Sequence, residues 1–319
     1  MESTKDAAPP SAGFARILLC LDSVEASRCA AAFTRRLAGP GTELTVAALA
    51  LDPHLLASSG VLSGLDYDAA HEELQQGAQR AIVESMTMLA ESAAAVRTRV
   101  IDLTNEGAGV ADAVVAEAHD ACADLLTLGI RQHHGLVRWF DPSVAGKLSQ
   151  IAPCAMIVVP AVYVITRDII LQRILFAVDG SVTALAAVDI GARLAAADTR
   201  IRVIHVVDRA MSQGKFVQPN PSEDIFVNEG ARALEAAARK LEPLRNVTPS
   251  LVSTDQISTA TSEDDIASAI LREAERWNAD LVVLGTHGRR GDARAYLGSV
   301  PNRVASLIEI PLMLVRELA

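Results

Sequence analysis

The chain has 319 residues, of which 50% are hydrophobic and 21% are charged, and it carries a formal net charge of −10. This length suits two domains of ordinary size, and the composition is typical of well-buried cores and excludes a chain dominated by disorder. The excess of acidic side chains repels a phosphate backbone, so we expect no nucleic-acid partner.

The N-terminal residues and the cysteines indicate the compartment. Residues 1–13 are polar and lack the apolar core of a secretion signal, so we expect a flexible N-terminal tail. The longest apolar run, 151–165, contains two prolines and is shorter than the stretch of about 20 residues that spans a membrane. The four cysteines have no CxxC or zinc-finger spacing. We therefore expect a cytoplasmic protein with no membrane partner and no metal site.

An internal repeat organises the rest of the chain. Asp22 and Asp179 each follow a strand-like apolar run and are 157 residues apart, and Gly129 corresponds to Gly285 at an offset of 156. Such a constant offset is hard to obtain by chance, so we infer a duplication. Two unrelated α/β domains are the alternative. The predicted division is a tail over 1–13, a first domain over 14–160, a linker over 161–172 and a second domain over 173–319.

Each repeat alternates short apolar runs with helical patterns. Runs such as 281–284 are typical of strands buried on both faces of a parallel sheet. Acidic residues at 263–265 suit the start of a helix. We expect two tandem Rossmann-like, doubly wound α/β domains, each with a five-stranded parallel sheet and helices on both faces. For the second repeat the predicted strands are 173–178, 201–207, 247–254, 280–285 and 311–316, and the predicted helices are 182–197, 223–244 and 262–277.

The most specific motif follows the fourth predicted strand of the second repeat. Gly285, Gly288, Gly298 and Ser299 form the pattern G-x2-G-x9-G-S. Ligands of open parallel sheets bind beyond the carboxyl ends of the strands, where the strand order reverses. We expect Gly285 to allow a sharp turn and Gly288 to leave room for a ligand. We expect Ser299 to cap a helix, with Pro301 in its first turn, whose free N–H groups bind phosphate.

Three arginines lie between the second and third glycines of this motif, namely Arg289, Arg290 and Arg294. They could add positive charge toward a polyphosphate. The alternative is that they are simply solvated.

In identity and spacing, this motif resembles the ATP-binding signature of the universal stress protein (UspA) family, and the resemblance covers residues 14 to 317. It implies a tandem protein with two Usp domains, whose second domain binds ATP or another adenine nucleotide, with magnesium as an optional companion. It implies that Asp179 contacts the adenosine moiety; a turn former at the end of a strand is the alternative for this residue. The positions that the family implies for the base and sugar are Ala177, Asp179, Val206, Leu284 and Gly285, and those for phosphate and ribose are Gly288, Gly298, Ser299 and Val300.

The first repeat keeps only the outer members of the motif. Gln132 and Pro142 replace the second and third glycines, and Asp141 adds negative charge. Each change opposes triphosphate binding, so we expect one nucleotide per chain. Binding of a nucleoside or another small ligand near Asp22 stays open as an alternative.

The histidines carry weaker signals. His133 and His134, together with Trp139, have no obvious carboxylate partner and are interpreted as a surface loop. His119 and Cys122 could supply two zinc ligands, but a structural zinc site needs four, so we expect no zinc site here. For His205, in an apolar strand, we expect a satisfied interior residue, and for His287 we expect the loop backbone to matter more than the imidazole.

These features favour binding over catalysis. No P-loop occurs, because Gly146-Lys147 lacks the upstream glycine and the following Ser or Thr. We expect a stress-response protein that acts by nucleotide-dependent regulation or interaction with an unidentified client protein, has no catalytic residue and hydrolyses ATP weakly at most. A nucleotide-independent scaffold and a very slow ATPase are the alternatives.

The last strand of each repeat gives an expectation about assembly. The segments 155–159 and 311–316 are apolar and carry no charge that would protect an exposed sheet edge. The family resemblance implies pairing through this strand, because single-domain members commonly dimerise there. We therefore expect the two domains to pair within the chain, and association of whole chains stays open.

Overall fold

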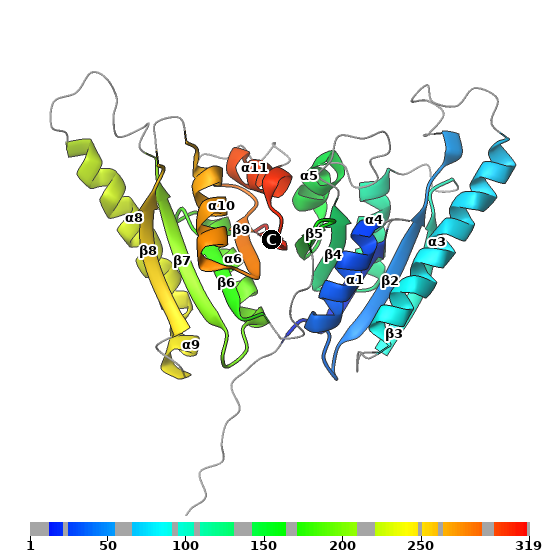
Figure 1. The fold of residues 1–319 in the computed structure, drawn as a ribbon, viewed down its shortest axis with the longest axis horizontal. Coiled ribbons are helices and arrows are strands. Elements are labelled where there is room, and N and C mark those ends of the chain that lie inside the picture. Colours follow the sequence, from blue (N-terminus) through cyan, green and yellow to red (C-terminus); the bar gives the residue numbers. More distant parts are fainter. Residues whose placement is uncertain are drawn as a thin grey trace, which may run out of the picture.

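The structure is a computed structural model of the chain. It describes residues 13–21, 25–54, 66–90, 95–104, 109–130, 142–163, 171–208, 221–247, 251–260, 264–288 and 297–317. Among these residues, ten strands form one continuous sheet in the order β3-β2-β1-β4-β5-β10-β9-β6-β7-β8 (Figure 1). The strands of the N-terminal half are β1 (Arg16–Leu21), β2 (Glu43–Ala50), β3 (Ala95–Asp102), β4 (Leu125–Ile130) and β5 (Ala155–Pro160). Those of the C-terminal half are β6 (Arg173–Ala177), β7 (Arg200–Val207), β8 (Val252–Ser258), β9 (Leu281–Gly285) and β10 (Leu312–Val315).

Each half contributes five parallel strands, and the two sets are joined edge to edge. β1 pairs in parallel with β2 and β4, and β6 pairs in the same way with β7 and β9. β5 and β10 pair antiparallel, with Met313 opposite Ile157. The predicted doubly wound fold and the predicted pairing of the two terminal strands are both confirmed.

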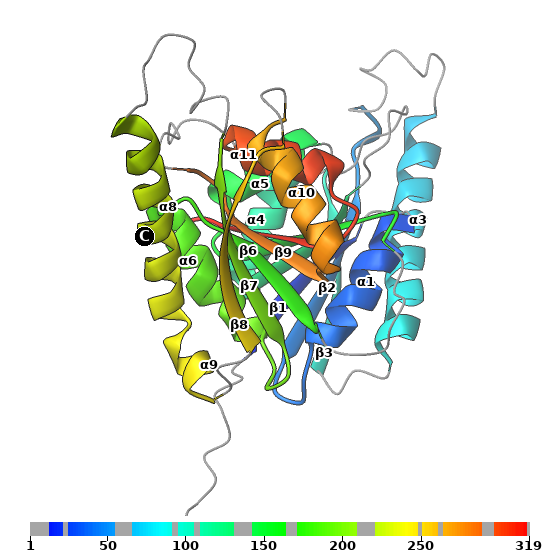
Figure 2. The ribbon, with the colours of Figure 1, turned by 60° about the vertical axis from the view of Figure 1, so that its left-hand side comes forward.

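Helices cover both faces of this sheet. The α1/α6 face carries α1 (Glu25–Leu37), α3 (Tyr67–Leu89), α6 (Val182–Gly191) and α8 (Pro221–Lys240). The α10/α11 face carries α4 (Val110–Asp120), α5 (Pro142–Ile151), α10 (Ile266–Trp277) and α11 (Ser299–Leu307). Figure 2 shows α3 and α8 at the two outer margins of the molecule. A short 3-10 helix, η1 (Ala192–Leu194), follows α6, and α9 (Glu242–Val247) follows α8.

The strands alternate between two apolar cores. Ile17 and Leu19 of β1 face the helices of the α1/α6 face, whereas Leu18 and Cys20 face those of the α10/α11 face. Strands buried on both sides need the continuous apolar runs that the sequence contains. No helix within the described ranges is both long enough and apolar enough to cross a membrane.

Most predicted elements of the C-terminal half agree with the structure, but one strand was placed wrongly. The prediction 247–254 corresponds to β8, which spans Val252–Ser258. The helical chain continues through α9 as far as Val247, and β8 pairs with β7 from Ile201 onward, which sets its start. The predicted helix 182–197 is also shorter, because α6 gives way to the 3-10 turn of η1. The predicted helix 262–277 begins later, at Ile266, because Asp265 is the N-cap of α10.

The duplication is visible in side-chain hydrogen bonds. The Asp124 carboxylate accepts a hydrogen bond from the backbone N–H of Arg16 at 2.9 Å, and Asp280 accepts one from Arg173 at 2.8 Å. Each aspartate therefore anchors the first residue of the first strand of its own half.

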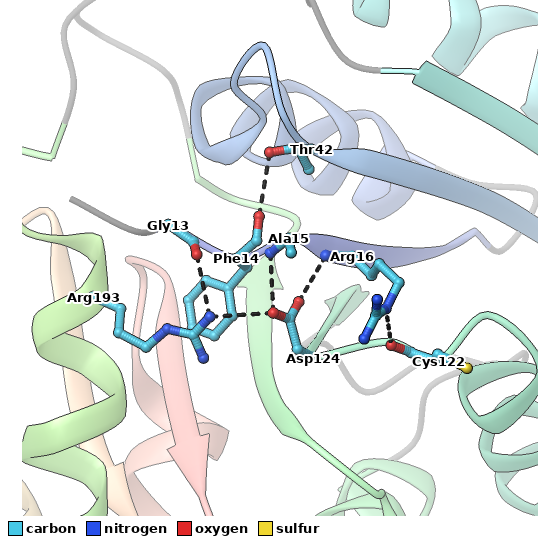
Figure 3. Close-up of polar contacts among 8 residues, drawn as sticks. All are labelled: Gly13, Phe14, Ala15, Arg16, Thr42, Cys122, Asp124 and Arg193. Carbon is cyan, nitrogen blue, oxygen red and sulfur yellow. Dashed lines mark hydrogen bonds and ion pairs between the residues drawn. The ribbon is translucent and has the colours of Figure 1, made fainter. Parts of the chain in front are cut away.

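Asp124 also lies at a contact between the two halves (Figure 3). Arg193 of η1 donates to Asp124 Oδ2 at 3.2 Å and to the Gly13 carbonyl at 3.1 Å. Its guanidinium lies 4.3 Å from the centre of the Phe14 ring, within the range of a cation–π interaction. One arginine of the C-terminal half thus binds the segment that leads into β1.

Candidate functional site

The candidate site lies at the carboxyl ends of β6 and β9. β6 lies between β7 and β9, so the chain leaves β6 toward one side and returns to the sheet on the other. The loops after β6 and β9 diverge at this point, which is where open α/β sheets bind ligands. The strand order therefore places the glycine motif of the second repeat at the position where open α/β sheets bind ligands.

Four predicted contacts with the base or sugar share one side of the sheet. Ala177, Val206, Leu284 and Val300 all belong to, or pack against, the apolar core of the α10/α11 face. Leu284 is only 4% exposed, whereas Ala177 and Val300 are half-buried. These residues come from β6, β7, β9 and α11 and make this side of the strand ends apolar.

Asp179 forms the turn between β6 and α6. Its Oδ1 accepts a hydrogen bond from Ser181 N at 2.9 Å, and the following Gly180 has a φ of +82°, which only glycine adopts readily. Ser181 then caps α6 by accepting a hydrogen bond from Ala184 N at 3.2 Å. The turn-forming role of Asp179 is therefore present in the structure, and it fixes the direction of the carboxylate.

The glycine that ends β9 and the glycine three residues later each lie close to another part of the site. A Cβ at Gly288 would lie 2.7 Å from Asp179 Oδ2, so the space beside Gly288 is occupied by this carboxylate. A Cβ at Gly285 would lie 2.8 Å from the backbone of Thr183 and of Ala184. Gly285 has no positive φ; among the described glycines only Gly180 has one. Gly285 therefore permits close packing of β9 against the start of α6, and the chain bends directly after it, at Thr286 and His287, as expected.

The loop after β9 is tied at both ends. The His287 carbonyl accepts hydrogen bonds from the hydroxyls of Thr183 and Ser181, the latter at 3.3 Å. The buried Thr286 donates its N–H to Val315 O at 2.9 Å, and its carbonyl accepts from Gly298 N at 2.9 Å. The Gly298 bond closes the loop and places the third glycine of the motif beside the first two.

The helix start at this loop differs by one residue from the prediction. Gly298, and not Ser299, is the N-cap of α11, because its carbonyl accepts the first intrahelical hydrogen bond, from Asn302 N at 3.0 Å. Ser299 is the first helical residue and is exposed. Pro301 lies in the first turn, as expected. The N–H groups of Ser299 and Val300 therefore stand at the open start of α11, where an anion is favoured.

Part of the predicted site falls outside the described residues. This applies to Arg289, Arg290 and Arg294 in the C-terminal half. It applies equally to Asp22, Gln132, His133, His134, Trp139 and Asp141 in the N-terminal half. Gly129 lies in β4 opposite Val159, and Pro142 begins α5. In the described parts of the chain, no group of three or more His, Cys, Asp or Glu side chains could hold a metal ion.

Sequence reasoning missed two hydroxyls that shape the site, and it predicted His205 as a satisfied interior residue without its partner. Thr183 and Ser181 hold the His287 carbonyl, and His205 contacts the carbonyl of Val178 through Nδ1 at 2.8 Å. The only signal in the sequence was Ser181 following the Asp-Gly turn. The contacts of Thr183 and His205 depend on how α6 and β7 pack against the turn, which no local motif records.

Comparison with known proteins places this architecture in a family. The family model for the universal stress protein family matches residues 13–160 and 171–316. The chain therefore belongs to the universal stress protein family and contains two Usp domains.

The individual relatives are distant in sequence. A universal stress protein from Methanocaldococcus jannaschii is 28% identical over 149 residues, which cover 46% of this chain and 82% of the relative. A solved universal stress protein from Archaeoglobus fulgidus aligns with a TM-score of 0.58 at 14% identity, over 95% of this chain and 96% of its own. A putative universal stress protein from Pseudomonas aeruginosa aligns with a TM-score of 0.50 at 15% identity, over 97% and 95%. The structural matches establish the fold of the tandem chain.

Proposed function

We propose that the C-terminal Usp domain binds one adenine nucleotide per chain, ATP in the first place, and that occupancy regulates the protein's interaction with a client in the stress response. The observation that carries this proposal is the closed G-x2-G-x9-G-S loop. The N–H of its third glycine, Gly298, donates to the Thr286 carbonyl at 2.9 Å, and its second glycine lies against the Asp179 carboxylate. The proposal keeps 14–160 and 173–319 as the two domains, with 161–172 as the linker.

The residues divide by chemistry. Ala177, Val206 and Leu284 supply an apolar floor for a planar base. An ionised Asp179 can only accept hydrogen bonds, which suits the hydroxyls of a ribose. Phosphate would be held by backbone N–H groups at the start of α11, from Ser299 and Val300, with Gly298 and Gly288 keeping bulk away. These assignments extend the family's motif residue by residue.

The same residues favour binding over turnover. Efficient phosphoryl transfer needs metal ligands and a positioned group that activates the nucleophile. The sequence contains no P-loop, whose Lys and Ser or Thr serve the phosphates and magnesium, and magnesium stays an optional companion of ATP. We accordingly propose at most weak hydrolysis. The cytoplasm is the proposed compartment, because the four cysteines, all within the described residues, form no disulfide bond, as is usual where thiols stay reduced.

The central experiment asks whether the protein carries a nucleotide. The full chain is purified without added nucleotide and denatured, and the released small molecules are separated by chromatography. Calorimetry with ATP then gives the affinity and the stoichiometry. Adenine nucleotide in the extract, or binding close to one ATP per chain, supports the proposal. If the extract contains no nucleotide and calorimetry gives no signal, the nucleotide-independent scaffold is favoured. Binding of two ATP per chain would contradict the expectation that the degenerate first domain binds none.

A matched pair of variants at Gly298 tests the phosphate loop. Its φ of −59° is one that proline adopts, so Gly298→Pro removes the hydrogen bond to Thr286 with little change in the dihedral angle. We expect ATP affinity to fall at least tenfold, or about 1.4 kcal/mol. Gly298→Ala keeps the N–H and places a Cβ 3.3 Å from the Thr286 carbonyl oxygen, so it measures the effect of added bulk without loss of the donor. Wild-type affinity in a folded Gly298→Pro variant would remove this loop from the site.

A further inference from the structure

His205 on β7 makes a hydrogen bond that bears on the candidate site. Its side chain is 8% exposed, and its Nδ1 lies 2.8 Å from the carbonyl oxygen of Val178. A carbonyl oxygen only accepts, so Nδ1 must carry the proton. Val178 immediately precedes Asp179, and its own N–H donates to Ile204 O at 2.9 Å. Both sides of the residue before Asp179 are therefore tied to β7.

The fold makes room for this imidazole. A Cβ at Gly230 of α8 would lie 2.5 Å from His205 Cδ2 and 2.7 Å from Gln256 Nε2. Gln256 is the direct neighbour of His205 in the β7–β8 ladder. Its Nε2 is buried and has no hydrogen-bond partner among the described residues. A side chain at position 230 would push the ring away from the Val178 carbonyl.

The N-terminal half shows that the fold does not need this polar pair. Ala48 and Val100 are neighbours in the β2–β3 ladder, as His205 and Gln256 are in β7–β8. The repeat offset equates the two pairs, so the first domain has two apolar residues where the second has two polar ones. Buried polar groups lower stability unless they are fully paired. The half that keeps the complete glycine motif thus also keeps a polar pair whose presence packing does not explain.

We propose that His205 is a positioning residue of the nucleotide site. Its imidazole holds the Val178 carbonyl and thereby fixes the turn that presents Asp179 to Gly288, so that the carboxylate is set to accept hydrogen bonds from the adenosine moiety. This inference rests on the proposed nucleotide binding and names the residue that orders its adenosine side. His205 touches no ligand in this arrangement; it acts through the backbone of Val178.

The test uses the full chain and three variants. His205→Leu removes the donor while keeping an apolar side chain of moderate volume. His205→Asn places an amide N–H near the former position of Nδ1. Val203→Ala, two residues earlier on the same strand and facing the same core, is the matched control for lost packing. Calorimetry measures the affinity of each for ATP, ADP and AMP, and thermal unfolding measures the stability.

We expect His205→Leu to lose about tenfold in affinity, since a buried carbonyl left without its donor no longer holds the turn in place. The loss should be the same for ATP, ADP and AMP, because Asp179 serves the part that these nucleotides share. His205→Asn should recover most of the affinity. Val203→Ala should lower the melting temperature without changing the affinity.

Results that would overturn this inference can be distinguished from results that would also overturn the proposed function. Wild-type affinity in a folded His205→Leu chain overturns the inference alone, as does a His205→Asn variant that binds no better than His205→Leu. A wild-type chain that binds no adenine nucleotide overturns the proposed function and this inference together. If the variants do not fold, nitrogen NMR of the wild-type imidazole decides. An Nδ1–H tautomer whose signal shifts when ATP is added supports the proposal, and an Nε2–H tautomer or an unshifted signal refutes it.

Discussion

Glycines at the site act for different physical reasons. Gly180 supplies a positive φ, Gly285 lets β9 approach the start of α6, and Gly288 lies against the Asp179 carboxylate. Gly298 contributes an N–H that closes the loop onto Thr286. A spacing pattern in the sequence presents the last three as equivalent, although only one of them borders a charged group.

Gly288→Ala is therefore expected to act on the carboxylate. Gly288 is exposed, so a methyl group there should not overpack the core, but it would lie 2.7 Å from Asp179 Oδ2 and displace it. We expect ATP affinity to fall about tenfold, roughly 1.4 kcal/mol, with little change in melting temperature. Calorimetry and thermal unfolding of the full chain measure both. Gly41→Ala, where nothing lies within 4 Å of the new Cβ, is the control. If Gly288→Ala binds ATP as tightly as the wild type, the position of the Asp179 carboxylate does not matter for binding.

At this scale the sequence could predict which residues gather, but not what each one touches. Asp179 was predicted to contact the adenosine moiety and Gly288 to face the phosphates, and each follows the end of a different strand. Their contact depends on the positions of two loops relative to α6, which are set by tertiary packing. The contact of His205 with Val178 also lies beyond local reasoning, since a histidine in an apolar strand has many possible partners. Nucleotide contacts of all these residues stay predictions.

Among the elements, α4 and α10 show what the duplication preserved. Each carries a buried glutamate, Glu117 or Glu273, at matching positions in the repeat. Glu117 pairs with Arg99 of β3 at 3.1 Å, whereas Glu273 pairs with Arg202 of β7 at 2.8 Å. Both repeats contain the buried carboxylate, but its arginine partner comes from a non-equivalent strand in each repeat. A buried charge must be paired, but the fold allows more than one origin for the partner.

The start of α10 gives a prediction about pH. The pKa of Asp265 is lowered chiefly because its carboxylate accepts a hydrogen bond from Ser268 N, at 2.7 Å, with Arg303 of α11 adding to the effect. A folded pKa below the usual 3.8 stabilises the protein above that pH, and the contribution is lost as the pH falls through the folded value. Asp265→Ala should therefore destabilise the chain by about 1 kcal/mol at neutral pH.

The measurement is the difference in unfolding free energy between the wild type and Asp265→Ala from pH 7 to pH 3. We expect this difference to shrink below about pH 4, where the unfolded carboxylate becomes protonated. Asp265→Asn keeps a cap acceptor without the charge, so its own stability should vary less with pH at this site. A difference that stays constant over the whole range would show that charge has no part in this cap.

The element boundaries also show where local patterns lose information. The sequence predicted four strands of the C-terminal half to within one residue, because each is a short apolar run buried on both sides. β8 is an outer strand with exposed Ser253, Thr254 and Asp255, so it has no such run and its start was misplaced. A strand at the edge of a sheet is positioned by its neighbour's backbone, which the sequence does not display.

In the whole molecule, the contacts between the two halves include a sheet pairing, a polar contact of Arg193 at one end of the sheet, and a hydrogen bond from Arg316 to the Gln150 carbonyl. β5 and β10 make the ten strands continuous, and Arg193 binds Gly13, Phe14 and Asp124 of the other half. The apolar pairing was predictable from two unprotected edges. The arginine contact was not, because it depends on how η1 lies against the start of β1.

Arg193→Ala tests the polar contact. Cation–π interactions and partly exposed ion pairs each contribute about 0.5–1 kcal/mol, so we expect a loss of about 1–2 kcal/mol in the free energy of unfolding. Arg239→Ala is a matched control, because Arg239 pairs with Glu235 on the exposed surface of its own helix, where little is at stake. Urea unfolding of the two variants measures the difference. Equal stabilities would mean that the Arg193 contact adds nothing measurable to the joint between the two halves.

Met313→Lys tests the sheet pairing itself. Met313 and its partner Ile157 are both fully buried at the centre of the joint between the two halves. A lysine there would leave an unpaired charge in an apolar core, at a cost of several kcal/mol in the free energy of the paired state. The joint should therefore open and leave the edges of β5 and β10 unpaired, and such edges pair with other chains.

The expected result for Met313→Lys is a lower melting temperature together with either a larger radius of gyration in small-angle scattering or association between chains in sizing chromatography. Met313→Leu keeps the volume and the apolar character, so it should retain the wild-type scattering profile. The backbone hydrogen bonds of the pairing are available to both variants, and only the buried charge separates them. A compact monomeric Met313→Lys chain with wild-type stability would show that the halves are held by contacts away from the strand pair, with the Arg193 contact as the first to examine.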